Sequence, residues 1–207
     1  MEFIRMIAQY GVDEDIATAL FETEMSNLDL YGYGIKAFML SLVECSIRIT
    51  GGAVTAATIG KIIALGKGIL QHPIELLDDV KTVLEKLAPG YRLIVATKGD
   101  LLDQQRKMTG SRISSYFHHI EVMSDKKEHN YVQLLKHLDI KPGEFLMIGN
   151  SLRSDIIPPL RLGACAIHVP YHTTWAHEEV DENPGSDRFY RVHRLIEILD
   201  LLQVPRN

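Results

Sequence analysis

The first 72 residues repeat apolar side chains every three or four positions, which is the spacing of one face of an α-helix. No run in this region alternates apolar and polar residues as a half-buried strand does. Glycine-containing turns separate the apolar runs. We therefore expect residues 1–72 to form a bundle of three or four amphipathic helices. The clearest apolar runs are Ile16, Leu20, Phe21, Met25 and Leu28; Ile35, Phe38, Met39, Leu42, Val43 and Ile47; and Ile59, Ile62, Ile63, Ile69 and Leu70.

The pattern changes at His72-Pro73, where short runs rich in β-branched residues begin to alternate with helical runs. Such alternation is typical of an α/β domain, a Rossmann-like parallel sheet with helices on both faces. We expect this domain to cover residues 73–207, with the boundary near residue 72. The expected strands are 92–97, 119–123, 145–149 and 165–170, and the expected helices are 77–88, 100–109, 127–138, 154–162 and a last one near 190–202.

The composition is that of an ordinary globular protein, with 46% hydrophobic and 24% charged residues. The net charge of −5 argues against a protein that binds nucleic acid or a membrane surface, since such proteins carry basic clusters. No apolar run is long enough to span a bilayer, and the first residues do not have the pattern of a signal peptide. We expect a cytoplasmic protein with neither nucleic acid nor a membrane among its partners.

Cysteine and histidine give no recognisable metal motif. Cys45 and Cys165 are far apart in apolar surroundings, so neither a disulfide nor a cysteine metal site is indicated. The nine histidines fit no zinc spacing, and scattered histidines are more often surface or core residues than ligands. The segment from Trp175 to Glu178 is a candidate for lining the mouth of a site, although partial burial of the single tryptophan explains it equally well.

Polar residues that suit an anion follow the first expected strand of the α/β region. Thr97 closes an apolar run and is followed by Lys98 and Gly99. A hydroxyl, a cation and a flexible backbone at the carboxyl end of a strand suit phosphate, because such ends gather helix N-termini and loop side chains. The alternative is that Thr97 only caps the helix that begins near Asp100.

Two later strand ends carry further candidates. Lys126 and Lys127 open a helix, where their charge opposes the helix dipole, so one of them is expected to serve another purpose; a solvated surface lysine explains the other. The run from Gly149 through Asn150 to Asp155 joins the next strand to a helix. A carboxylate at the start of a helix can cap it, bind a hard cation, or do both.

Taken in order, Thr97, Lys126 and the run from Gly149 to Asp155 resemble the second, third and fourth motifs of the haloacid dehalogenase superfamily. Residues 1–72 resemble its helical cap of the C1 type, and the rest of the chain resembles its α/β core. The resemblance implies a Mg²⁺-dependent phosphatase that acts on a small phosphorylated metabolite through an aspartyl-phosphate intermediate.

The resemblance also implies a role for each candidate residue. Thr97 would hydrogen-bond the transferring phosphoryl group, with Lys98 and Gly99 completing its binding site. Lys126 would hold the nucleophile and neutralise charge on the phosphoryl oxygens. Asn150 and Asp155 would ligate Mg²⁺. Because an asparagine stands where the family usually has an aspartate, we expect the metal site to be weakened.

The largest departure from the family is the lack of a first motif, the Asp-x-Asp-x-Thr that supplies the nucleophile and the acid/base at the end of the first strand. Asp13-Glu14-Asp15 has the spacing but follows a helix-like run and a turn, so we interpret it as a helix start with Asp13 as a plausible N-cap. We expect that the chain lacks the first strand, that it is N-terminally truncated, and that it is inactive or impaired as given.

Two further expectations follow from the resemblance. A sheet without its central strand would have a gap between the strands that bear Thr97 and Gly149, and the unpaired edges would favour a homo-oligomer. The alternative function is a non-catalytic binding or scaffold protein of the same fold that has lost its nucleophile. A dehalogenase ranks lower, because the Thr97-Lys98-Gly99 cluster suits phosphate.

Overall fold

The computed structural model describes residues 2–172, 175–178, 180 and 184–204. It divides the chain into two compact units. One unit comprises Met1–Ile74 with Lys98–Gly110, and the other comprises Glu75–Thr97 with Ser111–Asn207. Helices and parallel strands together confirm the mixed α/β class. Residues 98–110 belong to the same unit as the N-terminal helices, whereas a division near residue 72 stays a prediction.

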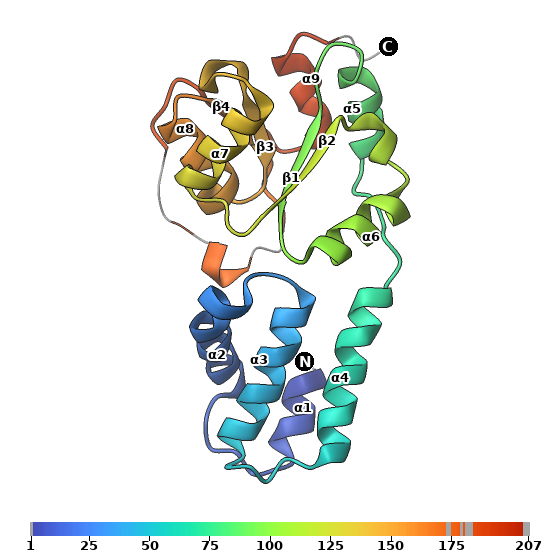
Figure 1. Ribbon diagram of the computed structural model, residues 1–207, viewed down its shortest axis with the longest axis vertical. Coiled ribbons are helices and arrows are strands. Elements are labelled where there is room, and N and C mark those ends of the chain that lie inside the picture. The colour runs from blue at the N-terminus through green and yellow to red at the C-terminus, as the bar shows by residue number, and fades with distance from the viewer. Residues whose placement is uncertain (1, 173–174, 179, 181–183, 205–207) are drawn as a thin grey trace. The chain divides into compact units, whose positions relative to one another are not determined.

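The N-terminal unit is built from helices that lie side by side (Figure 1). Residues 2–72 contain no strand among those that the structure describes, as their apolar spacing predicts. The buried side chains come from every helix and form one core, listed as Phe3, Ile7, Ile16, Ala19, Leu42, Cys45 and Ile62. The helices are α1 (Glu2–Ala8), α2 (Ile16–Tyr31), α3 (Ile35–Ile49) and α4 (Ala56–Gln71).

Asp15, and not Asp13, caps helix α2. Its carboxylate accepts a hydrogen bond from the backbone N–H of Thr18 at 3.0 Å and from the Thr18 hydroxyl at 2.6 Å. These bonds, the hydroxyl bond first, lower the pKa of Asp15. The helix starts at Ile16 because this carboxylate satisfies a backbone N–H of its first turn. The segment Asp13-Glu14-Asp15 therefore leads into a helix, as we inferred from the sequence.

Helix α6 (Leu101–Ser111) joins this unit through its first residues. The Lys36 ammonium lies 2.9 and 3.0 Å from the two carboxylate oxygens of Asp100. The same carboxylate accepts the backbone N–H of Asp103 at 3.1 Å, so Asp100 caps α6. The alternative in which Thr97 serves as this cap is wrong, because a carboxylate three residues later already performs that role.

The strands of the α/β unit form two separate sheets. Strands β1 and β2 pair in one, and β3, β4 and β5 lie in that order in the other, where they run parallel. Among the described residues no strand joins the two sheets. The strand that carries Thr97 and the strand that ends at Gly149 thus belong to different sheets. The strands are β1 (Ile94–Lys98), β2 (His119–Met123), β3 (Leu146–Gly149), β4 (Cys165–His168) and β5 (Phe189–Arg191).

Helices of this unit pack around these strands (Figure 1). Tyr131 and Leu134 of α7 are almost fully buried in a cluster that includes Met123 of β2 and Met147 of β3. One helix thereby packs against residues from both sheets. The helices are α5 (Val80–Leu87), α7 (Glu128–Leu138), α8 (Ile157–Arg161) and α9 (Ile198–Leu201).

The end of the chain differs from the expected helix over residues 190–202. Phe189 to Arg191 form strand β5, which pairs with β4 so that Phe189 faces Ala166. The helical part begins later, with a 3₁₀ turn at Leu195–Glu197 that leads into α9. A strand of three residues is too short to show a period of two, and its aromatic pair is its only signal in the sequence.

Candidate active site

A buried ion pair lies between the segments that follow β2 and β3. The Lys126 ammonium is 2.6 Å from one carboxylate oxygen of Asp155, and the two side chains are only 9% and 8% exposed. Lys126 stands two residues before α7, and Asp155 lies in a π-helical turn at Leu152–Ile156. The two residues are 29 positions apart, and both were predicted site residues. The structure brings them together.

The backbone around Asp155 is shaped to receive its carboxylate. The second carboxylate oxygen accepts the backbone N–H of Ser151 at 3.0 Å, and the Ser151 hydroxyl accepts the N–H of Ser154 at 3.0 Å. A Cβ built on Gly149 would stand 2.5 Å from the Cβ of Asp155 and closer still to its carboxylate. Only glycine fits at the end of β3, because any side chain would occupy the place of the acid.

Tyr131 of α7 holds this turn in place through a hydrogen bond. Its hydroxyl donates to the backbone carbonyl of Ser154 at 2.8 Å, and its ring is fully buried. Burial raises the pKa of Tyr131 far above its usual range, and the negative charges of Asp155 and Glu178 raise it further. The phenol therefore stays protonated and remains a donor at any physiological pH.

Glu178 is a residue that sequence reasoning missed. Its carboxylate accepts the hydroxyls of Ser151 and Ser154, the latter at 2.5 Å. Arg153 also donates to the backbone carbonyl of His177 at 2.9 Å. The segment that ends in Glu178 is thus bonded to the turn that carries Asp155. The sequence marked this segment as a candidate for lining the site, but nothing in its spacing pointed to the two serines.

Asn150 presents an exposed side chain, while its backbone is held by a histidine. His168 Nε2 lies 2.9 Å from the Asn150 carbonyl oxygen, and His168 Nδ1 lies 3.2 Å from Nε of Arg191. A carbonyl only accepts and a guanidinium only donates, so the neutral tautomer with its proton on Nε2 satisfies both contacts. Burial lowers the pKa of His168, and the charge of Arg191 lowers it further.

Protein stability is expected to fall as the pH drops below about 6.5, the usual pKa of an unfolded histidine. Because the pKa of His168 is lowered by folding, the unfolded chain takes up a proton that the folded protein resists. Urea unfolding at pH 7.5, 6.5 and 5.5 measures this slope. His168→Gln should flatten it, whereas the exposed His118→Gln should not. Equal slopes in all three proteins would contradict the assignment.

The other predicted site residues have the following places. Thr97 is half-buried near the carboxyl end of β1. The Lys98 ammonium lies 4.0 Å from the centroid of the Tyr33 ring, and Gly99 takes a positive φ of 126°. Lys127 is 67% exposed and pairs with Asp125 at 3.0 Å, so it is the solvated lysine of the pair. Phosphate binding by Thr97, Lys98 and Gly99 stays a prediction.

The donors around Asp155 suit a hard cation. The Asp155 carboxylate and the Asn150 amide are oxygen donors, the type of ligand that Mg²⁺ prefers over nitrogen and sulfur. Asn150 contributes no charge, so a cation there would depend mainly on Asp155 for neutralisation.

None of the described helices has the length and apolar content to cross a membrane.

The family model described as haloacid dehalogenase-like hydrolase matches residues 3–163. A crystal structure of a haloacid dehalogenase-like family hydrolase from Xanthomonas campestris is 33% identical, with a TM-score of 0.86 over 98% of this chain and 80% of that one.

Two curated relatives are named as phosphatases. N-acylneuraminate-9-phosphatase of Mus musculus is 31% identical over 141 residues, which is 65% of this chain and 54% of the relative. Glyceraldehyde 3-phosphate phosphatase of Pyrococcus furiosus is 27% identical over 129 residues, 59% of this chain and 52% of the relative. The chain spans about half the length of these relatives. The family match over residues 3–163 shows that the chain belongs to the haloacid dehalogenase-like hydrolases.

Proposed function

We propose that the chain forms the phosphate- and metal-binding part of a Mg²⁺-dependent phosphatase for a small phosphorylated metabolite. The observation that carries this proposal is the buried pair of Lys126 and Asp155, set where β2 and β3 end. A cation beside a carboxylate is what a metal-assisted phosphoryl site needs, because the lysine neutralises phosphoryl oxygens and the acid holds the metal. The two relatives named as phosphatases support the same reaction class.

The residues then take these roles. Thr97 donates its hydroxyl to the transferring phosphoryl group, and Lys98 and Gly99 lie next in the chain to complete its binding. Lys126 supplies the positive charge. Asp155 and the amide oxygen of Asn150 would hold Mg²⁺, which would supply positive charge to the phosphoryl oxygens. Gly149 and Ser151 keep the Asp155 carboxylate in place.

We propose further that this chain as given is inactive or impaired. The family's nucleophile and acid/base belong to an Asp-x-Asp motif at a strand end, and the one such spacing here, Asp13 to Asp15, starts helix α2. The separation of β1 and β3 into two sheets is consistent with a missing strand between them. A non-catalytic binding protein is the second candidate, favoured by the neutral Asn150.

Phosphate release from a panel of small phosphomonoesters, with and without Mg²⁺, tests the proposal. We expect no turnover by the 207-residue chain. We expect Mg²⁺-dependent turnover when an N-terminal strand with the Asp-x-Asp-x-Thr motif is joined to it, and loss of that turnover in Asp155→Ala. Turnover by the 207-residue chain that survives Asp155→Ala would show that the site is wrongly assigned. Phosphate binding without turnover by the extended, folded protein would favour the binding protein.

A further inference from the structure

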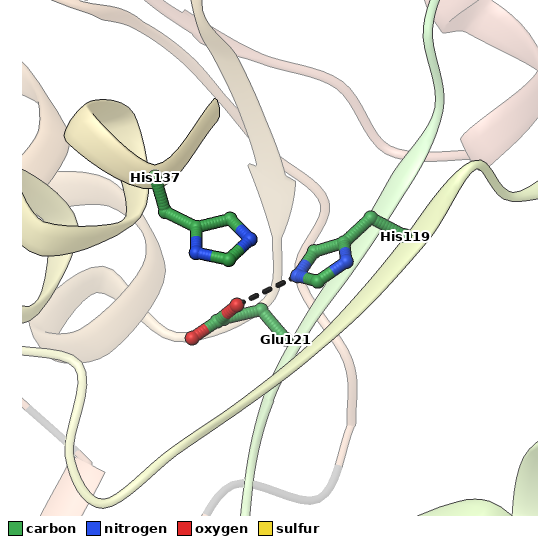
Figure 2. Close-up of side chains that lie close together, drawn as sticks. All are labelled: His119, Glu121 and His137. Atoms are coloured by element: carbon green, nitrogen blue, oxygen red, sulfur yellow. Dashed lines mark hydrogen bonds and ion pairs between the residues drawn. The ribbon is translucent and has the colours of Figure 1, made fainter. Parts of the chain in front are cut away.

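Three potential metal ligands gather at the far end of β2 from Lys126. His119 and Glu121 belong to β2, and His137 lies in the last turn of α7. Their ligand atoms all lie within 4.8 Å of one another. Figure 2 shows the His137 ring directed from its helix toward the two side chains on the strand. Among the residues that the structure describes, these are the three metal-ligating side chains whose ligand atoms lie this close together.

The local fold explains why these residues meet. His119 and Glu121 are two positions apart on a strand, so both point to the same face of the sheet. Helix α7 begins just after the segment that carries Lys126 and packs against Met123 of β2 through its apolar side. The last turn of α7 therefore lies near the start of β2. This places His137 beside the two β2 side chains.

The side chains of the cluster contact one another, so their ligand atoms lie close together. His119 Nε2 is 2.7 Å from a carboxylate oxygen of Glu121. The rings of His119 and His137 are stacked, with centroids 5.1 Å apart and an angle of 27° between their planes. All three side chains are at least partly open to solvent, so an ion can reach them. Two imidazoles and a carboxylate at this spacing can supply three ligand atoms to a cation.

The ligand types select the metal. Two histidines and one carboxylate suit zinc and neighbouring divalent transition metals, whereas Mg²⁺ prefers oxygen ligands alone. Ligands bonded to zinc at about 2.0–2.1 Å lie roughly 3.3 Å apart in a tetrahedral site. His137, which is exposed, would have to move toward the other two side chains, and water would fill the fourth position.

We propose that His119, Glu121 and His137 form a binding site for a divalent transition metal ion of the zinc class. The site is separate from the Lys126–Asp155 pair and does not depend on the phosphatase proposal. Zinc at this position links the start of β2 to the end of α7. The segment between these two elements carries Lys126, so the ion stabilises the strand–helix unit that positions the lysine.

Calorimetric titration of the 207-residue chain with ZnCl₂ alone tests this site. We expect a one-equivalent site that binds at least about tenfold more weakly in His119→Ala and in His137→Ala, since removing a ligand costs no less than removing an outer-shell partner. We also expect Tm to rise by about 5–10 °C in the wild type when zinc reaches a hundred times its Kd, with a smaller rise in both variants.

His118→Ala is the matched control, because His118 is the exposed neighbour of His119 and lies outside the cluster. It should bind zinc like the wild type. Circular dichroism checks that each variant is folded. Should a histidine variant fail to fold, Glu121→Gln keeps the shape of its side chain, removes its charge and should also weaken zinc binding. Unchanged zinc affinity in the folded cluster variants, or an equal loss in His118→Ala, would overturn the proposal.

Discussion

Lys126→Met is expected to lower the free energy of unfolding by about 3 kcal/mol, because it leaves the Asp155 carboxylate buried without its cation. The Lys126 ammonium lies 2.6 Å from an Asp155 carboxylate oxygen, and both side chains are more than nine-tenths buried. The backbone N–H of Ser151 still reaches the acid but cannot neutralise it. Urea unfolding followed by circular dichroism measures the loss.

Lys127→Met provides the matched control. Lys127 is the next residue, is 67% exposed, and pairs with Asp125 at the surface. An exposed ion pair contributes at most about 1 kcal/mol, so this variant should unfold almost like the wild type. Similar losses in the two variants would mean that Lys126 is not specially placed.

Gly149→Ala is expected to destabilise the protein by about 2 kcal/mol and to displace Asp155. The added methyl group would overlap the Asp155 side chain, whose Cβ lies 2.5 Å from the ideal position of the new atom. Overpacking of this kind forces side chains or backbone to shift, typically at a cost of about 1–3 kcal/mol. Because the carboxylate must move, contact with Lys126 is lost as well. Thermal unfolding and a crystal structure of the variant measure both effects.

Gly143→Ala is the control for this change. Gly143 lies in the turn before β3, is exposed, and has no atom within 4 Å of a built Cβ. Its alanine variant should therefore keep the wild-type Tm within a degree or two. If Gly149→Ala also left Tm and the position of Asp155 unchanged, the close packing described at the end of β3 would be incorrect.

The sequence predicted the elements that have clear periodicity. Strand β2 has the expected bounds, and α7 begins one residue later than expected. The alternation of strand and helix placed Lys126 and Asp155 after expected strands, and the family resemblance named both as site residues, but their ion pair was not predicted.

What the sequence could not predict depends on contacts between distant segments. The bonds from Glu178 to Ser151 and Ser154 join parts of the chain more than 20 residues apart, and no local pattern encodes them. The histidine cluster was missed for the same reason. His119 and His137 belong to different elements, and a search for linear zinc motifs does not compare a strand face with a helix end. Strand β5 was too short to show its period.

The most direct test of the proposed phosphatase site is the binding of inorganic phosphate in the presence of Mg²⁺, followed by NMR titration. Wild-type protein, Thr97→Ala and Lys126→Met would be compared with Lys127→Met, each shown to be folded at the temperature used. The proposal predicts that the first two substitutions weaken phosphate binding at least about tenfold, since each removes a charged or hydroxyl donor, while Lys127→Met binds normally. Phosphate affinity that is the same in all four proteins would contradict it.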